Sequence, residues 1–211
     1  MTASSVQPAQ PIRLYRHALS GHAHRVELFL SLLGLPSVLV DVDLKGGEHK
    51  SAAFLAKNPF AQVPVIEDGD VVVADSNAIL VYLATRYDTA GRWLPREAAP
   101  AAAVQRWLSV AAGALAFGPA AARLVTVFGA PLDHERAKSI AAQLFAVLEP
   151  HLSVRPFVTG AAPTIADLAL YSYTAHAPEG GVSLEPYPQI RAWLARIEAL
   201  PGFVAMRKTP V

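Results

Sequence analysis

A serine and two histidines within five residues are the first candidates for chemistry in this chain. The segment Ser20-Gly21-His22-Ala23-His24 directly precedes an apolar helical pattern, so Ser20 would lie at the N-terminus of a helix. A hydroxyl there can donate to a thiolate and, together with the helix field, lower a thiol pKa from about 8.5. The alternative is that Ser20 only caps the helix. Two histidines without an obvious third ligand do not make a zinc site, so we expect no metal.

The chain contains no cysteine among its 211 residues. It therefore has no disulfide, no cysteine metal ligand and no cysteine nucleophile. Any thiol chemistry must use a thiol that a ligand brings in.

A Val63-Pro64 pair precedes an apolar strand pattern. Proline cannot donate to a sheet ladder, so it belongs at the first residue, an edge or a bulge of a strand. A cis bond at Pro64 would turn the backbone of Val63 outward, where a peptide could pair with it like an added strand. A trans proline that merely starts the strand is the alternative.

Two further segments could hold charged groups. Asp75-Ser76 opens a helical pattern; free N–H groups at a helix N-terminus bind carboxylates, and Asp75 could meet an ammonium. His49 and Lys50 follow a glycine pair in a predicted loop, where Lys50 suits a carboxylate and His49 can donate a hydrogen bond. Taken singly, a helix cap and a solvated loop are the simpler interpretations.

The elements that must position these side chains fall into two halves. Residues 11–87 read as strand, helix, strand, loop, strand, strand, helix, which predicts a small mixed four-stranded sheet with helices. The run Val38–Val42 is almost wholly apolar, so we expect that strand to be covered on both faces. Asp68-Gly69 between apolar runs predicts a hairpin.

Helical patterns alone follow, which makes the fold class α+β. We expect a loose tail at 1–10, a linker at 88–96 and an all-helical half at 97–211, with breaks near Gly118-Pro119, Gly129, Pro150 and Pro156. Thr164 and Asp167 are spaced as a capping box. The net charge is +1 without a basic cluster, so nucleic acid is a poor partner. No run approaches about 18 apolar residues and no secretory signal opens the chain, so we expect a cytoplasmic protein with no membrane partner.

Taken together, several motifs closely resemble those of the glutathione transferases, especially serine-type, phi-like bacterial members. The resemblance covers nearly the whole chain beyond the tail. The motifs that carry it are Gly47-Glu48-His49-Lys50, Asn58-Pro59-Phe60-Ala61-Gln62-Val63-Pro64, Glu67-Asp68-Gly69 with Asp75-Ser76, Thr164-Ile165-Ala166-Asp167, Tyr187-Pro188 and Trp193.

The resemblance implies a thioredoxin-like first half, glutathione as co-substrate, and no other cofactor. Ser20, five residues before Arg25, matches the serine that stabilises the glutathione thiolate. The other matches are His49 and Lys50 for the glycine carboxylate, Gln62 and Val63 with cis-Pro64 for the cysteinyl backbone, Asp75 and Ser76 for the γ-glutamyl end, and Asp167 for folding. The sequence departs from the family at Ala61, where glycine is usual, so we expect an ordinary negative φ and a slightly different loop. It also departs around His22, so another polar group could share the role of Ser20.

The family also implies a detoxifying enzyme that conjugates glutathione to small hydrophobic electrophiles, and a homodimer. Candidates for the second-substrate pocket are His22, Trp107 and Phe117, with Phe128 and Tyr173 beside them. A glutathione-dependent peroxidase or disulfide reductase is one alternative. A binding or scaffold protein that has lost turnover is another, because fold alone does not fix function.

Overall fold

The computed structural model describes residues 6–210, so the first half of the predicted tail lies outside the described residues. The N-terminal half holds β1 (Ile12–Arg16), α1 (Gly21–Leu32), β2 (Ser37–Asp41), a 3-10 turn η1 (Glu48–Lys50), α2 (Ala52–Leu55), β3 (Val65–Asp68), β4 (Val71–Ala74) and α3 (Ser76–Tyr87). The sheet order is β2-β1-β3-β4. β1 is parallel to β2, and β3 is antiparallel to both β1 and β4. This confirms the predicted mixed sheet and hairpin.

Helices cover the sheet on both faces. Ile12, Leu14 and Ile66 share one core with the apolar sides of α1 and α3, and Phe54 of α2 packs with Val42 and Val65 in a smaller cluster. The prediction for the second strand was wrong, because β2 is an edge strand whose Val38 is 48% and Leu39 40% exposed. An apolar run gives no information about which strand position it will occupy.

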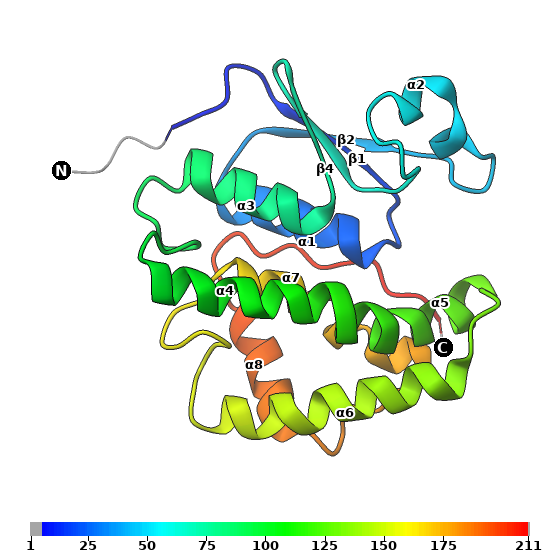
Figure 1. Ribbon diagram of the computed structural model, residues 1–211, viewed down its shortest axis with the longest axis vertical. Coiled ribbons are helices and arrows are strands. Elements are labelled where there is room, and N and C mark those ends of the chain that lie inside the picture. Colours follow the sequence, from blue (N-terminus) through cyan, green and yellow to red (C-terminus); the bar gives the residue numbers. More distant parts are fainter. Residues whose placement is uncertain (1–5, 211) are drawn as a thin grey trace.

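The C-terminal half is helical throughout (Figure 1). It comprises α4 (Ala98–Val110), η2 (Ala111–Ala120), α5 (Ala121–Phe128), α6 (His134–Ser153), α7 (Ile165–Ala175), a 3-10 turn η3 (Ala177–Gly180) and α8 (Pro188–Glu198). The capping box at Thr164 and Asp167 is confirmed. α5 ends at Gly129, which adopts the left-handed conformation that glycine tolerates.

Two predicted helix breaks are wrong. The segment Ala98–Phe128 runs as one continuous helical stretch, in which the π-helical η2 accommodates Pro119. Pro150 lies inside α6, one turn from its end. The stretch Ala98–Phe128 is long and apolar enough to cross a membrane by length and composition. It is a core helix of this fold, because Val104, Leu108 and Leu115 are buried in the common core.

A C-terminal segment joins the two halves after α8. The carbonyl oxygen of Gly202 accepts from Ser31 of α1 at 2.7 Å, and the carbonyl of Val204 lies 2.9 Å from His24 Nε2. Farther on, the amide of Thr209 donates to Glu179 at 3.2 Å. Figure 1 shows this segment running between the sheet half and the helical half.

Candidate active site

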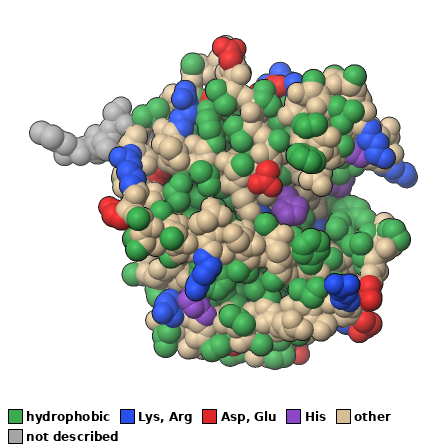
Figure 2. Space-filling view, in the orientation of Figure 1, with side chains coloured by type: hydrophobic (Ala, Val, Ile, Leu, Met, Phe, Trp, Pro, Cys, Tyr) green, Lys and Arg blue, Asp and Glu red, His purple; other side chains and the backbone are tan. Residues whose placement is uncertain are grey.

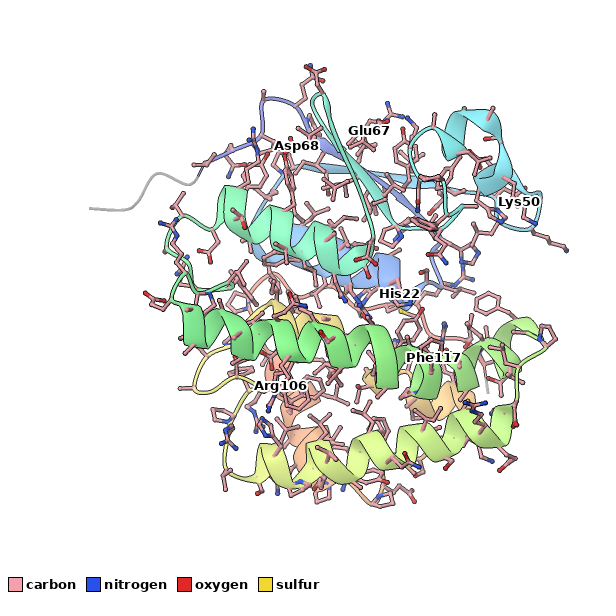
Figure 3. The ribbon with its side chains drawn as sticks, viewed as in Figure 1. His22, Lys50, Glu67, Asp68, Arg106 and Phe117 are labelled. Atoms are coloured by element: carbon pink, nitrogen blue, oxygen red, sulfur yellow. The ribbon has the colours of Figure 1, made fainter. Side chains whose placement is uncertain are left out.

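A cavity of about 790 Å³ opens beside the end of the sheet. Its walls come from the start of α1, the loop with η1, the segment before β3, the start of α3, and α5. The lining residues are His22, Leu44, His49, Asn58, Pro59, Phe60, Ala61, Gln62, Val63, Pro64, Ala74, Asp75, Ser76 and Leu124. Figure 2 shows the molecule hollowed between its two halves, near the place where Figure 3 labels His22.

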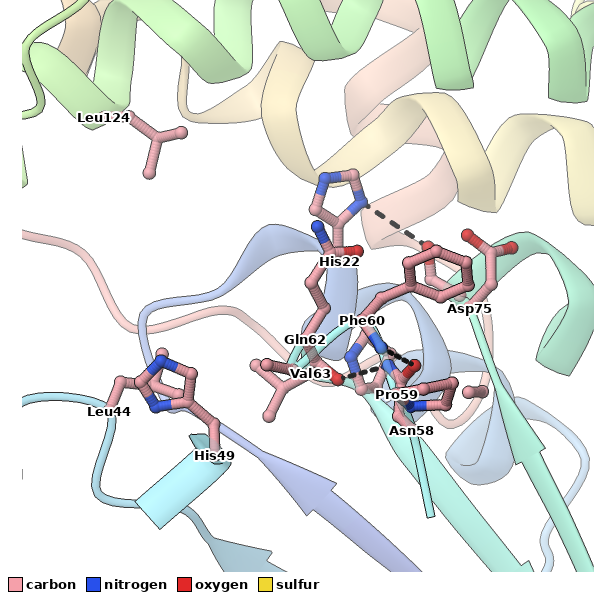
Figure 4. Close-up of a pocket in the computed structure, with 14 residues that line it drawn as sticks. His22, Leu44, His49, Asn58, Pro59, Phe60, Gln62, Val63, Asp75 and Leu124 are labelled. Carbon is pink, nitrogen blue, oxygen red and sulfur yellow. Dashed lines mark hydrogen bonds between the residues drawn. The ribbon is translucent and has the colours of Figure 1, made fainter. Parts of the chain in front are cut away.

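The segment before β3 forms the middle of this wall. The Val63–Pro64 bond is cis, as the sequence analysis expects. Asn58, 3% exposed, holds the turn: its Nδ2 donates to the Gln62 carbonyl at 2.8 Å and its Oδ1 accepts from the Phe60 amide at 3.0 Å. These bonds are drawn in Figure 4. The role of Asn58 was not among the expectations, although Asn-Pro is a turn signal in the sequence.

The expectation for Ala61 was wrong. Ala61 has φ +54°, so alanine adopts the left-handed conformation that glycine would adopt without strain. The bonds that Asn58 makes on both sides of this residue fix the turn, and the backbone geometry is kept despite the substitution.

Asp75 and Ser76 form the start of α3 at one end of the wall. Asp75 Oδ1 caps the helix by accepting from the amides of Asn77 and Ala78, both at 2.9 Å. Asp75 has φ +72°, an uncommon conformation for a residue with a side chain. The cap leaves Ser76, 4% exposed, as the first helical residue facing the cavity, where the field of the helix favours an anion.

His49 forms the opposite end of the wall. It lines the cavity, and its Nδ1 is buried without a hydrogen-bond partner. Buried polar atoms are usually satisfied, so an orphan nitrogen in a cavity wall suits a ligand. Lys50 is exposed and is not among the lining residues.

Ser20 is the N-cap of α1. Its Oγ accepts from the Ala23 amide at 3.2 Å, and its hydroxyl is also within hydrogen-bonding reach of the buried Tyr173 oxygen. Ser20 is not among the residues that line the cavity, whereas His22, two residues on, is. Gly21 between them has no room for a side chain, because an added Cβ would lie 2.8 Å from the Tyr173 ring.

His22 and His24 point to different places. His24 Nδ1 lies 2.9 Å from Ser172 Oγ in the interior, so the two imidazoles do not face a common ligand. His22 Nδ1 lies 3.4 Å from Ser76 Oγ. Burial and the nearby Arg25 guanidinium lower the pKa of His22 to about 3, so its ring is neutral near pH 7.

Two of the proposed second-substrate residues lie elsewhere. Trp107 is buried and contacts the His151 ring at a centroid distance of 4.9 Å. It lines a separate hollow between α4 and α6, where Figure 3 labels Arg106. Phe117 is 66% exposed and does not line the cavity. Leu124 of α5 does line it. The sequence does not indicate this role, because helical periodicity does not show which stripe of a helix faces the other half.

The fold and this cavity define a two-domain protein: a thioredoxin-like domain with a peptide-sized site at its sheet margin, followed by a helical domain. The glutathione S-transferase N-terminal domain profile matches residues 10–85, and the corresponding C-terminal domain profile matches residues 128–201. The chain belongs to the glutathione S-transferase family, and it is a glutathione transferase enzyme.

Similar proteins span almost the whole chain. Glutathione S-transferase 3 of Zea mays is 35% identical, over 92% of this chain and 91% of the relative. Glutathione S-transferase theta-1 of Bos taurus is 30% identical, over 93% and 86%. A crystal structure of a glutathione S-transferase from Pseudomonas fluorescens superposes with a TM-score of 0.88 at 33% identity, over 94% of this chain and 100% of that one.

Proposed function

We propose that this enzyme conjugates the glutathione thiolate to small hydrophobic electrophiles, and that the Ser20 hydroxyl stabilises the thiolate. The observation that carries the proposal is the order of groups along one cavity wall: His49, then Gln62 and Val63, then Asp75 and Ser76. Glutathione is an extended molecule with a carboxylate at one end and an ammonium and carboxylate at the other. A cation-bearing loop, a strand-like backbone and a helix N-terminus in this order match it.

Each end of the ligand has a physical partner. His49, helped by Lys50 at the loop surface, suits the glycine carboxylate, and the orphan Nδ1 of His49 can donate to it in the tautomer that carries the hydrogen there. The start of α3 suits the γ-glutamyl carboxylate, with Asp75 for the ammonium. A homologue from Drosophila mojavensis, 29% identical with a TM-score of 0.81 over 90% of this chain and 89% of that one, has a crystal structure with bound glutathione.

The thiol would then lie beside the start of α1. Ser20 Oγ accepts from the Ala23 amide, and its proton would be donated to sulfur in place of the Tyr173 oxygen. A hydrogen bond to a charged group contributes about 1.5–3 kcal/mol, and about 1.4 kcal/mol corresponds to a factor of ten. Loss of the hydroxyl should therefore raise the apparent thiol pKa by about 1–2 units.

The test compares three variants of one residue. Ser20→Ala and Ser20→Gly both lack the hydroxyl, but glycine remains a tolerable N-cap; Ser20→Thr keeps a hydroxyl. The pH dependence of kcat/KM with a chloronitrobenzene electrophile should show a raised thiol pKa and a rate at least tenfold lower near neutral pH in the first two variants only. An unchanged thiol pKa in Ser20→Ala and Ser20→Gly would remove Ser20 from the mechanism.

Other outcomes separate other functions. Turnover of an organic hydroperoxide without conjugation of any electrophile would indicate a peroxidase. Failure to retain the protein on immobilised glutathione would indicate a scaffold whose peptide site has decayed. We further propose a homodimer, which light scattering tests, and a cytoplasmic location, which fractionation of the source cells tests.

A further inference from the structure

His22 is the polar side chain that α1 directs into the cavity wall, and it is held on two sides. Its Nδ1 lies 3.4 Å from Ser76 Oγ, and its ring meets the Tyr173 ring edge-on, at a centroid distance of 4.9 Å and an interplanar angle of 71°. Tyr173 is 4% exposed and belongs to α7. A side chain fixed between both halves of the protein presents the rest of its ring to the cavity in one orientation.

The neighbours of Ser76 decide where the His22 proton lies. Arg25, 1% exposed, donates from Nη1 to Ser76 Oγ at 3.3 Å and to Asn77 Oδ1 at 2.9 Å. A guanidinium only donates, so Ser76 Oγ accepts from Arg25. A hydroxyl can accept twice or donate once, so the direction of its contact with His22 is an assignment, and we take Ser76 to donate its proton to Nδ1. The neutral ring of His22 then carries its hydrogen on Nε2.

The Nε2–H group faces the helical half. Figure 4 shows the His22 ring on the side of the cavity nearest the helices, with one nitrogen bonded to Ser76 and the opposite edge turned toward the side where Leu124 lies. In this view the Gln62 side chain extends toward the His22 ring, whereas Val63 lies farther from it. The donor is therefore placed where a second substrate would enter, rather than along the peptide backbone.

We propose that His22 Nε2–H is a hydrogen-bond donor to the second substrate, and that the enzyme favours electrophiles whose negative charge develops on oxygen, in particular α,β-unsaturated carbonyl compounds. This inference rests on the proposed conjugation reaction. The glutathione sulfur forms a bond to the β-carbon, and the carbon–carbon π pair shifts to give an enolate whose oxygen accepts the Nε2–H bond. The α-carbon then takes a proton from water, and the proton lost by the thiol goes to solvent, so the sum is a simple addition without an oxidant or reductant.

A neutral donor fits this step. The enolate oxygen gains most of its charge in the transition state, so a fixed donor stabilises the transition state more than the bound substrate. An alkyl halide such as benzyl chloride places its developing charge on a departing halide. The rate of conjugation of such a halide should depend less on a directed N–H group.

The test uses two amide variants that differ in reach. His22→Asn can keep the contact at the Nδ1 position with Ser76 but does not reach the Nε2 position; His22→Gln places an amide N–H near Nε2. We would measure kcat/KM at saturating glutathione for an aliphatic enone and for benzyl chloride, with folding checked by thermal melting. The enone-to-benzyl-chloride ratio should fall about tenfold to a hundredfold in His22→Asn and stay within about threefold of wild type in His22→Gln.

The possible failures are distinguishable. If wild type conjugates both electrophiles and the ratio is unchanged in His22→Asn, the role of His22 is refuted and the proposed function stands. If both electrophiles lose the same factor in both variants, His22 acts on the thiolate or the fold, which also refutes the inference. If wild type binds glutathione but conjugates neither electrophile, the proposed function itself fails.

Discussion

Replacing Asp167 by alanine should strongly destabilise this protein, because several buried donors would lose their acceptor. Asp167 is 0% exposed. Its Oδ1 accepts from the Val158 amide and from Trp193 Nε1, both at 2.9 Å, and its Oδ2 accepts from the Thr164 amide at 2.9 Å. One side chain thus satisfies three buried donors from three segments of the helical domain.

The expected magnitude follows from those donors. Leaving a buried donor unsatisfied costs about 1–3 kcal/mol, so losing the acceptor for three of them should cost about 3–6 kcal/mol after local relaxation. Native domains are stable by about 5–15 kcal/mol. For a chain of this size about 1 kcal/mol shifts Tm by about 2–4 °C, so Asp167→Ala should lower Tm by about 6–24 °C.

The assay is urea unfolding followed by fluorescence and circular dichroism, at one fixed protein concentration because ligands or association would shift the curve. Asp167→Asn is the matched control: its single carbonyl oxygen can still accept from two donors, while its NH₂ opposes the third. Asp167→Asn should lose about half as much free energy of unfolding as Asp167→Ala. In a double-mutant cycle, Trp193→Phe removes one donor, so the losses should be less than additive. A loss below about 1 kcal/mol in Asp167→Ala, or strict additivity with Trp193→Phe, would refute the reasoning.

Two further predictions concern stability. Burial alone would raise the pKa of Glu179, but hydrogen bonds from Thr209, His176 and Arg123 lower it to about 2. A depressed carboxyl pKa stabilises the fold above the ordinary value of 4.5, and that contribution is lost as pH falls toward about 2. Glu179→Gln should flatten the dependence of the unfolding free energy on pH over this window in acid titration, and an unchanged slope would exclude the group. Ala61→Gly should raise the free energy of unfolding by about 0.5 kcal/mol in urea, because relief of a left-handed alanine outweighs the added chain entropy of glycine; a loss of stability would contradict the strain at φ +54°.

The sequence predicts best those features that local chemistry decides. The hairpin at Asp68-Gly69 forms because Gly69 takes a positive φ of +59°, and the capping box at Thr164 needs only residues three apart. The order of strands and helices in the first half follows from the apolar patterns. The cis bond before Pro64 was accessible only through the resemblance to a family.

The sequence predicts worst those features that depend on which face of an element meets which neighbour. Trp107 and Leu124 both lie on the long helical stretch Ala98–Phe128, but Leu124 lines the cavity and Trp107 lines a hollow on α4 and α6. A π-helical turn at Pro119 shifts the helical phase between them. The spacing of apolar residues in the sequence does not reveal such a shift. It therefore does not show which aromatic residue of this helical stretch lines the pocket.

The C-terminal segment carries a consequence for how the chain assembles itself. Gly202 and Val204 contact α1, and Thr209 contacts Glu179, which in turn binds Arg123 of α5 at 2.7 Å. Arg123 also donates to the carbonyl of Leu19 at 2.7 Å, directly before Ser20. During synthesis both halves emerge before the C-terminal segment is in place. The turn that carries Ser20 would therefore gain its final support only after the helices have formed. Catalytic competence should be the last property that the nascent protein acquires.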